Sequence, residues 1–111
     1  MKLLMFQARR FSFDHSNSTE AVRKETVSRS AGATLHDLTV VFIHAEAQDP
    51  PKEARLLVKC AKNIKWVANK RRLNTVVLHA FAHLSDSKAP IEFARGFLPT
   101  LADRLAEREP E

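Results

Sequence analysis

The segment LTVVFIHAE at residues 38–46 and the segment TVVLHAFA at residues 75–82 decide the fold. Both are rich in β-branched and aromatic residues, and each is apolar on two alternating faces, which is typical of central strands. Alternation places Val40 and His44 on one face of the first segment, and Val41 on the other. We therefore expect both segments to be strands inside a sheet.

Residues 49–72, between these strands, have the pattern of an amphipathic helix. Asp49 precedes two prolines, a helix-start signal in which the carboxylate caps free amides. The expected buried stripe consists of Ala54, Leu57, Cys60, Ala61, Ile64 and either Val67 or Ala68. Because a strand–helix–strand crossover is right-handed, the strands around residues 40 and 78 should be parallel neighbours.

The flanking segments add shorter elements. Residues 2–6 predict a strand that resumes at residues 11–13, and residues 14–32 read as a polar, serine-rich excursion compatible with a short helix at about 19–27. Pro90 opens a second helix, in which Pro99 predicts a kink or a restart near residues 97–99. Its expected buried stripe is Ile91, Ala94, Leu98, Leu101 and Leu105.

These elements predict a single domain over residues 1–111, an α/β fold with a small mixed β-sheet of three to four strands and two main helices. A sheet of that size has exposed edges and an uncovered face. A second copy of the chain would cover them, so we expect a homodimer.

Composition limits the function classes. Lysine and arginine outnumber aspartate and glutamate by 18 to 13, and the resulting charge of +5 favours a polyanionic partner. The single cysteine, Cys60, excludes an internal disulfide and a zinc finger and is expected in the core. With two glycines, the chain has no dinucleotide or P-loop motif, so no cofactor is expected. Residues 1–6 are too short an apolar run for a signal or a membrane span, which predicts a cytoplasmic protein without a membrane partner.

Two histidines fall in the second strand segment. His83 lies where the strand ends and the chain turns toward a helix, a common place for functional side chains. The alternative is a half-buried histidine bonded to a neighbouring backbone group, and for His79 a structural role is favoured. Four strand residues separate the two rings by about 13 Å, too far to share a metal. A metal site would need His36, His44 or Glu46, and we predict none.

A basic group surrounds the only tryptophan. It comprises Lys59, Lys62, Lys65, Trp66, Lys70, Arg71 and Arg72. Cations beside an aromatic ring can meet phosphates while a base stacks on the ring, which indicates nucleic-acid binding. The alternative is a solvated helix face, on which Trp66 covers a sheet edge or a dimer seam.

The stretch HAFAHLS at residues 79–85, followed by Pro90 and an amphipathic helix, resembles the archaeal-type threonyl-tRNA synthetase editing domain, which carries a similar Phe-Ala-His-Leu-Ser signature. The resemblance implies a fold like that of D-aminoacyl-tRNA deacylases and hydrolysis of Ser-tRNA(Thr), with the tRNA 3′ end as partner. It gives His83 a role in positioning substrate or water. It also makes Phe81, Ala82, Leu84 and Ser85 the wall of the substrate site.

The chain departs from that family at two places. Gln7-Ala8-Arg9 replaces a polar turn after the first strand, and no lysine matches the functional lysine of a further C-terminal region. We expect a shortened, freestanding relative that is either an aminoacyl-tRNA deacylase or a degenerate, non-catalytic module for dimerisation or RNA binding. A metal-dependent hydrolase using His79 or His83 is the third alternative.

Overall fold

The computed structural model describes residues 1–14, 19–23, 26–28 and 32–107 and contains one mixed sheet and two main helices. The strands are β1 (Lys2–Asp14), β2 (Thr19–Arg23), β3 (Thr26–Ser28), β4 (Gly32–His44) and β5 (Thr75–Ala80). The helices are η1 (Pro50–Lys52), a short 3₁₀ turn, then α1 (Glu53–Lys70) and α2 (Ile91–Ala106). The α/β prediction is confirmed, although the sheet has five strands rather than three to four.

The strand order is β1-β4-β5-β2-β3, so the two predicted strands lie at the centre of the sheet. β4 and β5 are parallel neighbours, with Thr39 opposite Val76 and Ile43 opposite Ala80. This confirms the crossover prediction. All the other strand pairs described are antiparallel.

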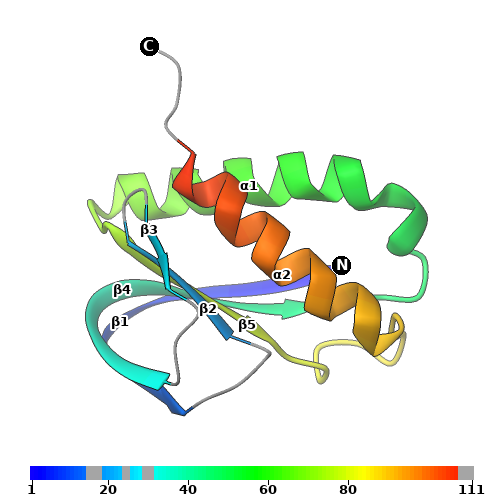
Figure 1. The fold of residues 1–111 in the computed structure, drawn as a ribbon, viewed down its shortest axis with the longest axis horizontal. Helices are drawn as coiled ribbons and strands as arrows, with labels where there is room; N and C mark the ends of the chain where they lie inside the picture. Colours follow the sequence, from blue (N-terminus) through cyan, green and yellow to red (C-terminus); the bar gives the residue numbers. More distant parts are fainter. Residues whose placement is uncertain (15–18, 24–25, 29–31, 108–111) are drawn as a thin grey trace.

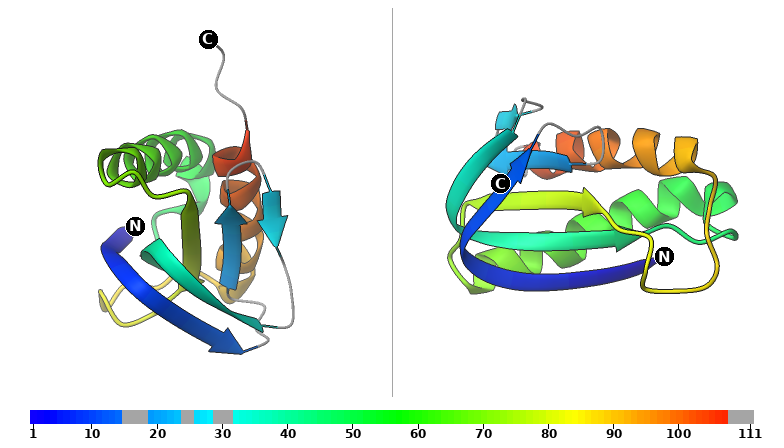
Figure 2. Two further views of the ribbon diagram at one scale, coloured as in Figure 1. Left: turned by 90° about the vertical axis from the view of Figure 1, so that its left-hand side faces the viewer. Right: turned by 90° about the horizontal axis from the view of Figure 1, so that it is seen from below.

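Both main helices pack on one face of the sheet (Figures 1 and 2). The core on this side joins Val41 and Ile43 of β4 to Ile64 of α1 and to Leu98 and Leu101 of α2. The alternation of β4 predicted this face correctly, since apolar side chains at every second position point to the same side. Neither helix in the described residues is long and apolar enough to cross a bilayer.

Part of the face without helices is buried by the chain itself. β1 and β4 pair along their whole length, from Lys2 opposite His44 to Asp14 opposite Gly32, and this long ribbon curls around the sheet (Figure 2). A second core forms on this side. It contains Ala21, Leu38, Val40 and Val77, with Ala8, Phe11, Phe13, Leu35 and Phe42 packed against them. Leu38 and Val40 are 0% exposed although no helix lies over them.

Several predictions for the flanking segments were wrong. No helix forms in the described part of residues 19–27; β2 and β3 are there instead, because β2 pairs with β5 along the sheet. Residues 15–18, 24–25 and 29–31 of the predicted excursion lie outside the described residues. β1 runs without the interruption expected at residues 7–10, since that stretch continues the ladder with β4.

The helix predictions need smaller corrections. Asp49 makes no side-chain cap at the helix start, because its carboxylate accepts hydrogen bonds from the Glu46 amide and the Met1 amine. Ala54 and Ile91, each at the first turn of its helix, are exposed rather than buried. The rest of the α1 stripe is confirmed, with Leu57, Cys60, Ala61, Ile64 and Ala68 buried. α2 continues through Pro99 without a restart.

Candidate functional site

The carboxyl ends of β4 and β5 meet at one edge of the sheet, and the candidate site lies there. In α/β sheets, ligands bind in the crevice beyond the carboxyl ends of the parallel strands. Two segments cover this edge, residues 45–49 after β4 and residues 81–90 after β5. We call the second segment the 81–90 loop.

Backbone hydrogen bonds attach both ends of the 81–90 loop to the end of β4. The Phe81 amide donates to the Ile43 carbonyl at 2.9 Å, and the Ala89 amide donates to the Ala45 carbonyl at 3.0 Å. β5 therefore ends at Ala80, two residues before the predicted boundary, while the chain stays in register with β4 at Phe81. The loop is therefore anchored at both ends.

His83 lies in this loop and is exposed. Its ring contacts the edge of the Phe81 ring, with centroids 5.1 Å apart, and Phe81 stacks on Phe42 at 5.0 Å. Among the described residues, no hydrogen bond to the His83 imidazole is found. The His83 side chain is thus open to solvent, where a ligand can reach it.

Two adjoining cavities flank the loop. One, of about 460 Å³, is polar and lined by Ala82, His83, Leu84, Ser85, Asp86 and Lys88. The other, of about 340 Å³, is largely apolar and lined by Ile43, Ala45, Ala80, Phe81, Ala82, Lys88, Ala89, Ile91 and Ala94. Each of the five predicted residues Phe81 to Ser85 therefore lines at least one of these cavities, and Ala82 lines both. The many alanines leave room for a small group rather than filling the cavity.

Lys88 is a site residue that the sequence analysis missed. Lys88 is exposed and lines both cavities, and so does Ala82. It is the only lysine or arginine between Arg72 and Arg95, so its ammonium group is the one basic charge of this loop. An isolated cation in a strand-to-helix connection is the signal that could have identified it.

A buried cluster of charged groups lies next to the 81–90 loop and bonds to it through Ser85. The Met1 amine lies 2.8 Å from Glu46 Oε1 and 3.0 Å from Asp49 Oδ1, and the Ser85 hydroxyl donates to Glu46 Oε2 at 2.9 Å. Burial opposes the charged amine, but its hydrogen bonds to the two carboxylates outweigh this and raise its pKa above 8.0. The bond from the amine, and then that from Ser85, lower the pKa of Glu46 below 4.5.

The remaining polar candidates have structural partners. His79 Nδ1 lies 2.7 Å from the Thr19 hydroxyl, and burial lowers the pKa of this histidine below 6.5. Burial also raises the pKa of the Cys60 thiol to about 11, which keeps it protonated in the core. No group of three metal-ligating side chains occurs within the described ranges.

The basic residues do not join the loop. Lys59, Lys62, Trp66 and Lys70 recur at helical spacing on one exposed side of α1, and Lys70 Nζ lies 4.8 Å from the Trp66 ring centroid. Trp66 is 62% exposed, whereas Lys65 is half-buried. Arg71 donates to Gln7 Oε1 at 3.2 Å.

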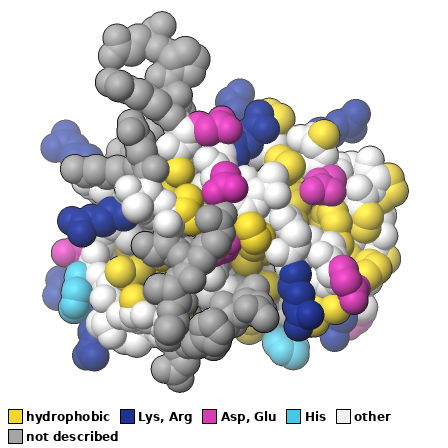
Figure 3. All heavy atoms as spheres, in the orientation of Figure 1, with side chains coloured by type: hydrophobic (Ala, Val, Ile, Leu, Met, Phe, Trp, Pro, Cys, Tyr) yellow, Lys and Arg dark blue, Asp and Glu magenta, His cyan; other side chains and the backbone are white. Residues whose placement is uncertain are grey.

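The α1 helix also sets the distance between the basic residues and the loop. α1 begins at the site edge of the sheet, and its 18 residues span about 27 Å toward the opposite edge. The basic residues lie along this length and just beyond it at Arg72, so one ligand that touched both regions would have to be extended. In the face seen in Figure 3, basic side chains lie both at the margin and within the face, and acidic side chains are scattered over the same face.

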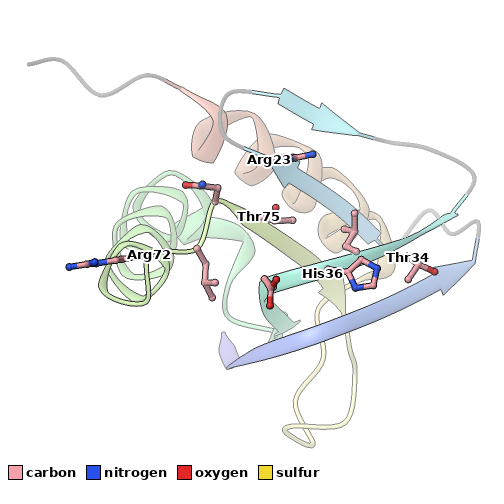
Figure 4. Close-up of a pocket in the computed structure, with 9 residues that line it drawn as sticks. Arg23, Thr34, His36, Arg72 and Thr75 are labelled. Carbon is pink, nitrogen blue, oxygen red and sulfur yellow. The ribbon is translucent and has the colours of Figure 1, made fainter.

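A cavity of about 500 Å³ lies at the other end of β5, away from the signature residues. Its lining is Arg23, Thr34, Leu35, His36, Asp37, Arg72, Leu73, Asn74 and Thr75. Figure 4 shows that Arg72 points away from His36 and Thr34. Arg23 lies on β2, whereas Thr34 and His36 lie on β4. The two cations therefore do not converge on a common point, and we assign the candidate site to the 81–90 loop.

The fold and the edge site define a small α/β domain with a ligand-sized cleft beyond its parallel strands. Residues 1–111 match the model of the archaea-specific editing domain of threonyl-tRNA synthetase. The chain belongs to this family.

Individual relatives agree with this assignment. The chain is 34% identical over 101 residues to the threonine–tRNA ligase of Pyrobaculum islandicum, covering 91% of this chain and 16% of that protein. It is 35% identical over 89 residues to that of Pyrobaculum arsenaticum, covering 80% and 14%. For Methanopyrus kandleri the identity is 27% over 108 residues, covering 97% and 17%. The chain thus spans about one sixth of the length of these curated relatives.

Proposed function

We propose that this chain hydrolyses the ester bond of mischarged aminoacyl-tRNA, with Ser-tRNA(Thr) as its substrate. The observation that carries the proposal is the position of His83, which is exposed on the 81–90 loop beside a small cavity lined largely by alanines. Membership of the editing-domain family supports the same substrate class. Translation takes place in the cytoplasm, and we propose that compartment for the protein.

In this proposal the two cavities divide the substrate between them. The side chain of the amino acid enters the apolar cavity of about 340 Å³, and the terminal adenosine lies in the polar cavity beside His83 and Lys88. The Lys88 ammonium attracts the phosphates of the tRNA end. Size alone separates serine from threonine weakly, because one methyl group changes binding by about 1–3 kcal/mol.

The reaction itself needs little from the protein beyond orientation. Water adds to the ester carbonyl carbon, the bond from that carbon to the ribose oxygen breaks, and the ribose oxygen takes up a proton. His83 is exposed next to the polar cavity, and its ring can accept or donate a hydrogen bond to the water or to the substrate. Holding the two reactants in place accounts for a large part of such rate enhancements.

Replacing His83 by alanine is expected to lower the rate of Ser-tRNA(Thr) hydrolysis about 10²-fold, the usual effect of losing a positioned group. The measurement is the release of labelled serine under single-turnover conditions, with Thr-tRNA(Thr) as the competing substrate. His36→Ala is the matched control, because His36 is an exposed histidine on β4 outside the site. A wild-type rate no faster than spontaneous hydrolysis rules out the proposed deacylase activity.

We further propose that the exposed side of α1 binds the RNA backbone. The combined variant Lys62→Ala, Trp66→Ala, Lys70→Ala should weaken tRNA binding and reduce the salt dependence of binding by about one unit of slope for each lost phosphate contact. Electrophoretic mobility shifts between 50 and 200 mM salt give both values, because the affinity falls with salt in proportion to the number of phosphate contacts. Lys2→Ala with Lys52→Ala is the control, since both lysines are exposed but lie outside α1. Unchanged affinity and slope contradict this surface.

The second candidate function is a non-catalytic module that dimerises, and exposed apolar residues favour it. β1 is an edge strand, and Leu4 and Phe6 on it are 45% and 38% exposed. Phe6 also packs edge-on against Phe42, with ring centroids 5.3 Å apart, so the apolar surface continues toward the 81–90 loop. A second copy of the chain would cover these side chains and the open backbone of β1.

If this surface is a dimer interface, Phe6→Ser combined with Leu4→Ser should convert dimer to monomer in sedimentation velocity. The comparison variant is Val58→Ser, which removes an apolar side chain that is 51% exposed on α1. A wild-type protein that stays monomeric at high micromolar concentration contradicts the interface. The deacylation assay is independent of this result, so the two candidate functions are tested separately.

A further inference from the structure

His44, the last residue of β4, is a buried imidazole that bonds to the 81–90 loop through both ring nitrogens. Its exposed fraction is 1%. Nε2 lies 2.6 Å from the Ser87 carbonyl oxygen, and the Leu84 amide lies 3.2 Å from Nδ1. The two partners are 43 and 40 residues away in the sequence, so these bonds join β4 to a distant part of the chain.

The partners define which nitrogen carries the proton. A carbonyl oxygen can only accept a hydrogen bond, so Nε2 must donate to Ser87. A backbone amide can only donate, so Nδ1 must offer its lone pair to Leu84. His44 is therefore neutral with its proton on Nε2, and either the other tautomer or the imidazolium would place a donor against a donor.

The Leu84 amide belongs to the peptide group that follows His83. The bond from this amide to His44 therefore fixes the plane of the His83–Leu84 peptide. Further side-chain bonds hold the same loop to the residues after β4: the Ser85 hydroxyl donates to Glu46, the Ala47 amide donates to the Ser87 hydroxyl at 3.0 Å, and the Ser87 hydroxyl donates to Gln48 Oε1 at 3.4 Å. Among the residues in these bonds, His44 is the one that lies in β4 itself and bonds to both Leu84 and Ser87.

We propose that His44 is a positioning residue, which holds the His83–Leu84 peptide in the orientation that presents His83 to the substrate. It does not touch the reacting atoms. The inference rests on the proposed hydrolysis for its catalytic consequence, but the contact itself is independent of any activity. The neutral Nε2-protonated ring is the form that does this.

Three variants separate the two bonds. In His44→Asn, the side-chain carbonyl stands near the place of Nδ1 and can still accept from Leu84, whereas the bond to Ser87 is lost. In His44→Gln, the terminal amide can still donate to Ser87, whereas the acceptor for Leu84 is lost. His44→Leu removes both. His79→Asn is the matched control, because His79 is a half-buried histidine of the neighbouring strand that bonds to Thr19 rather than to the loop.

The first measurement is amide hydrogen exchange by NMR on the full chain. The Leu84 amide should lose protection about tenfold or more in His44→Gln and His44→Leu, and keep most of it in His44→Asn and His79→Asn. Ring nitrogen shifts of the wild-type protein should show a neutral His44 protonated on Nε2. Unchanged Leu84 protection in His44→Leu, with thermal unfolding confirming that the variant folds, overturns the proposal, and so does a ring protonated on Nδ1.

The second measurement is the hydrolysis of Ser-tRNA(Thr). His44→Leu and His44→Gln should lower kcat about 10²-fold with a smaller change in KM, since a misplaced group costs turnover more than binding, and His44→Asn should recover much of the rate. Equal losses in all three variants overturn the positioning role. Absence of activity in the wild type is a failure of the proposed function alone, because the exchange experiment still decides whether His44 holds the loop.

Discussion

Replacing Asp49 by alanine should destabilise the protein by about 1–3 kcal/mol, the usual cost of leaving a buried hydrogen-bond donor without its acceptor. Asp49 is 2% exposed, and its two carboxylate oxygens accept from the Met1 amine at 3.0 Å and from the Glu46 amide at 2.6 Å. Without Asp49 the buried Glu46 amide loses its acceptor. Urea unfolding at neutral pH measures the loss. Asp49→Asn keeps an acceptor but no charge, so it should be intermediate, and an Asp49→Ala protein within 1 kcal/mol of wild type contradicts the assignment.

The same cluster predicts the pH dependence of stability. The pKa of Glu46 is lowered, so its contribution is present above about pH 4.5 and is lost as the pH falls through its value in the folded state. The pKa of the Met1 amine is raised, so its contribution is present below about pH 8.0 and is lost as the pH rises through its value in the folded state. Between these limits the advantage of the wild type over Glu46→Gln, which removes the carboxylate charge, should be largest, and it should shrink on both sides.

Replacing Leu38 by alanine should cost about 2–5 kcal/mol, as for other fully buried leucines. Leu38 is 0% exposed on the helix-free face, where the curled β1–β4 ribbon covers it. Leu4→Ala is the matched control, because Leu4 is on β1 of the same ribbon but 45% exposed, and its loss should be below about 1 kcal/mol. Chemical denaturation of both proteins distinguishes the cases. Equal losses would mean that the ribbon does not close over Leu38.

The central part of the fold could be predicted because its signals are local. The apolar alternation of residues 38–46 predicted both faces of β4, and the helix with its prolines placed β4 and β5 as parallel neighbours. Strand ends at such a pair form an edge site, so the sequence also predicted that His83 would emerge there. The structure places it in that loop, exposed.

β2 could not be predicted because it depends on distant contacts. The segment TEAVR has two charged residues in five and no strict alternation, yet Ala21 and Val22 are buried. What makes it a strand is the ladder with β5, from Thr19 opposite His79 to Arg23 opposite Thr75. Tertiary pairing of this kind overrides the local preference of a short segment.

The residues that hold the candidate site in place could not be predicted, for the same reason. His44 was considered as an alternating strand residue and as a residue that a metal site would need, and its bonds to Leu84 and Ser87 join positions about 40 residues apart. Asp49 was expected at a helix cap, but the Met1 amine lies 48 residues earlier in the chain and gives the carboxylate a better partner. Single-sequence patterns carry no information on such pairs.

The pairing of β2 with β5 has a consequence for synthesis. Arg23 finds its ladder partner at Thr75, so β2 leaves the ribosome long before β5 exists. At elongation rates of about 5–20 residues per second, the nascent β2 waits for several seconds with its edge open. β2 can pair with β3 first, and the curled ribbon can form once β4 is synthesised, so the insertion of β2 beside β5 is the late step of folding.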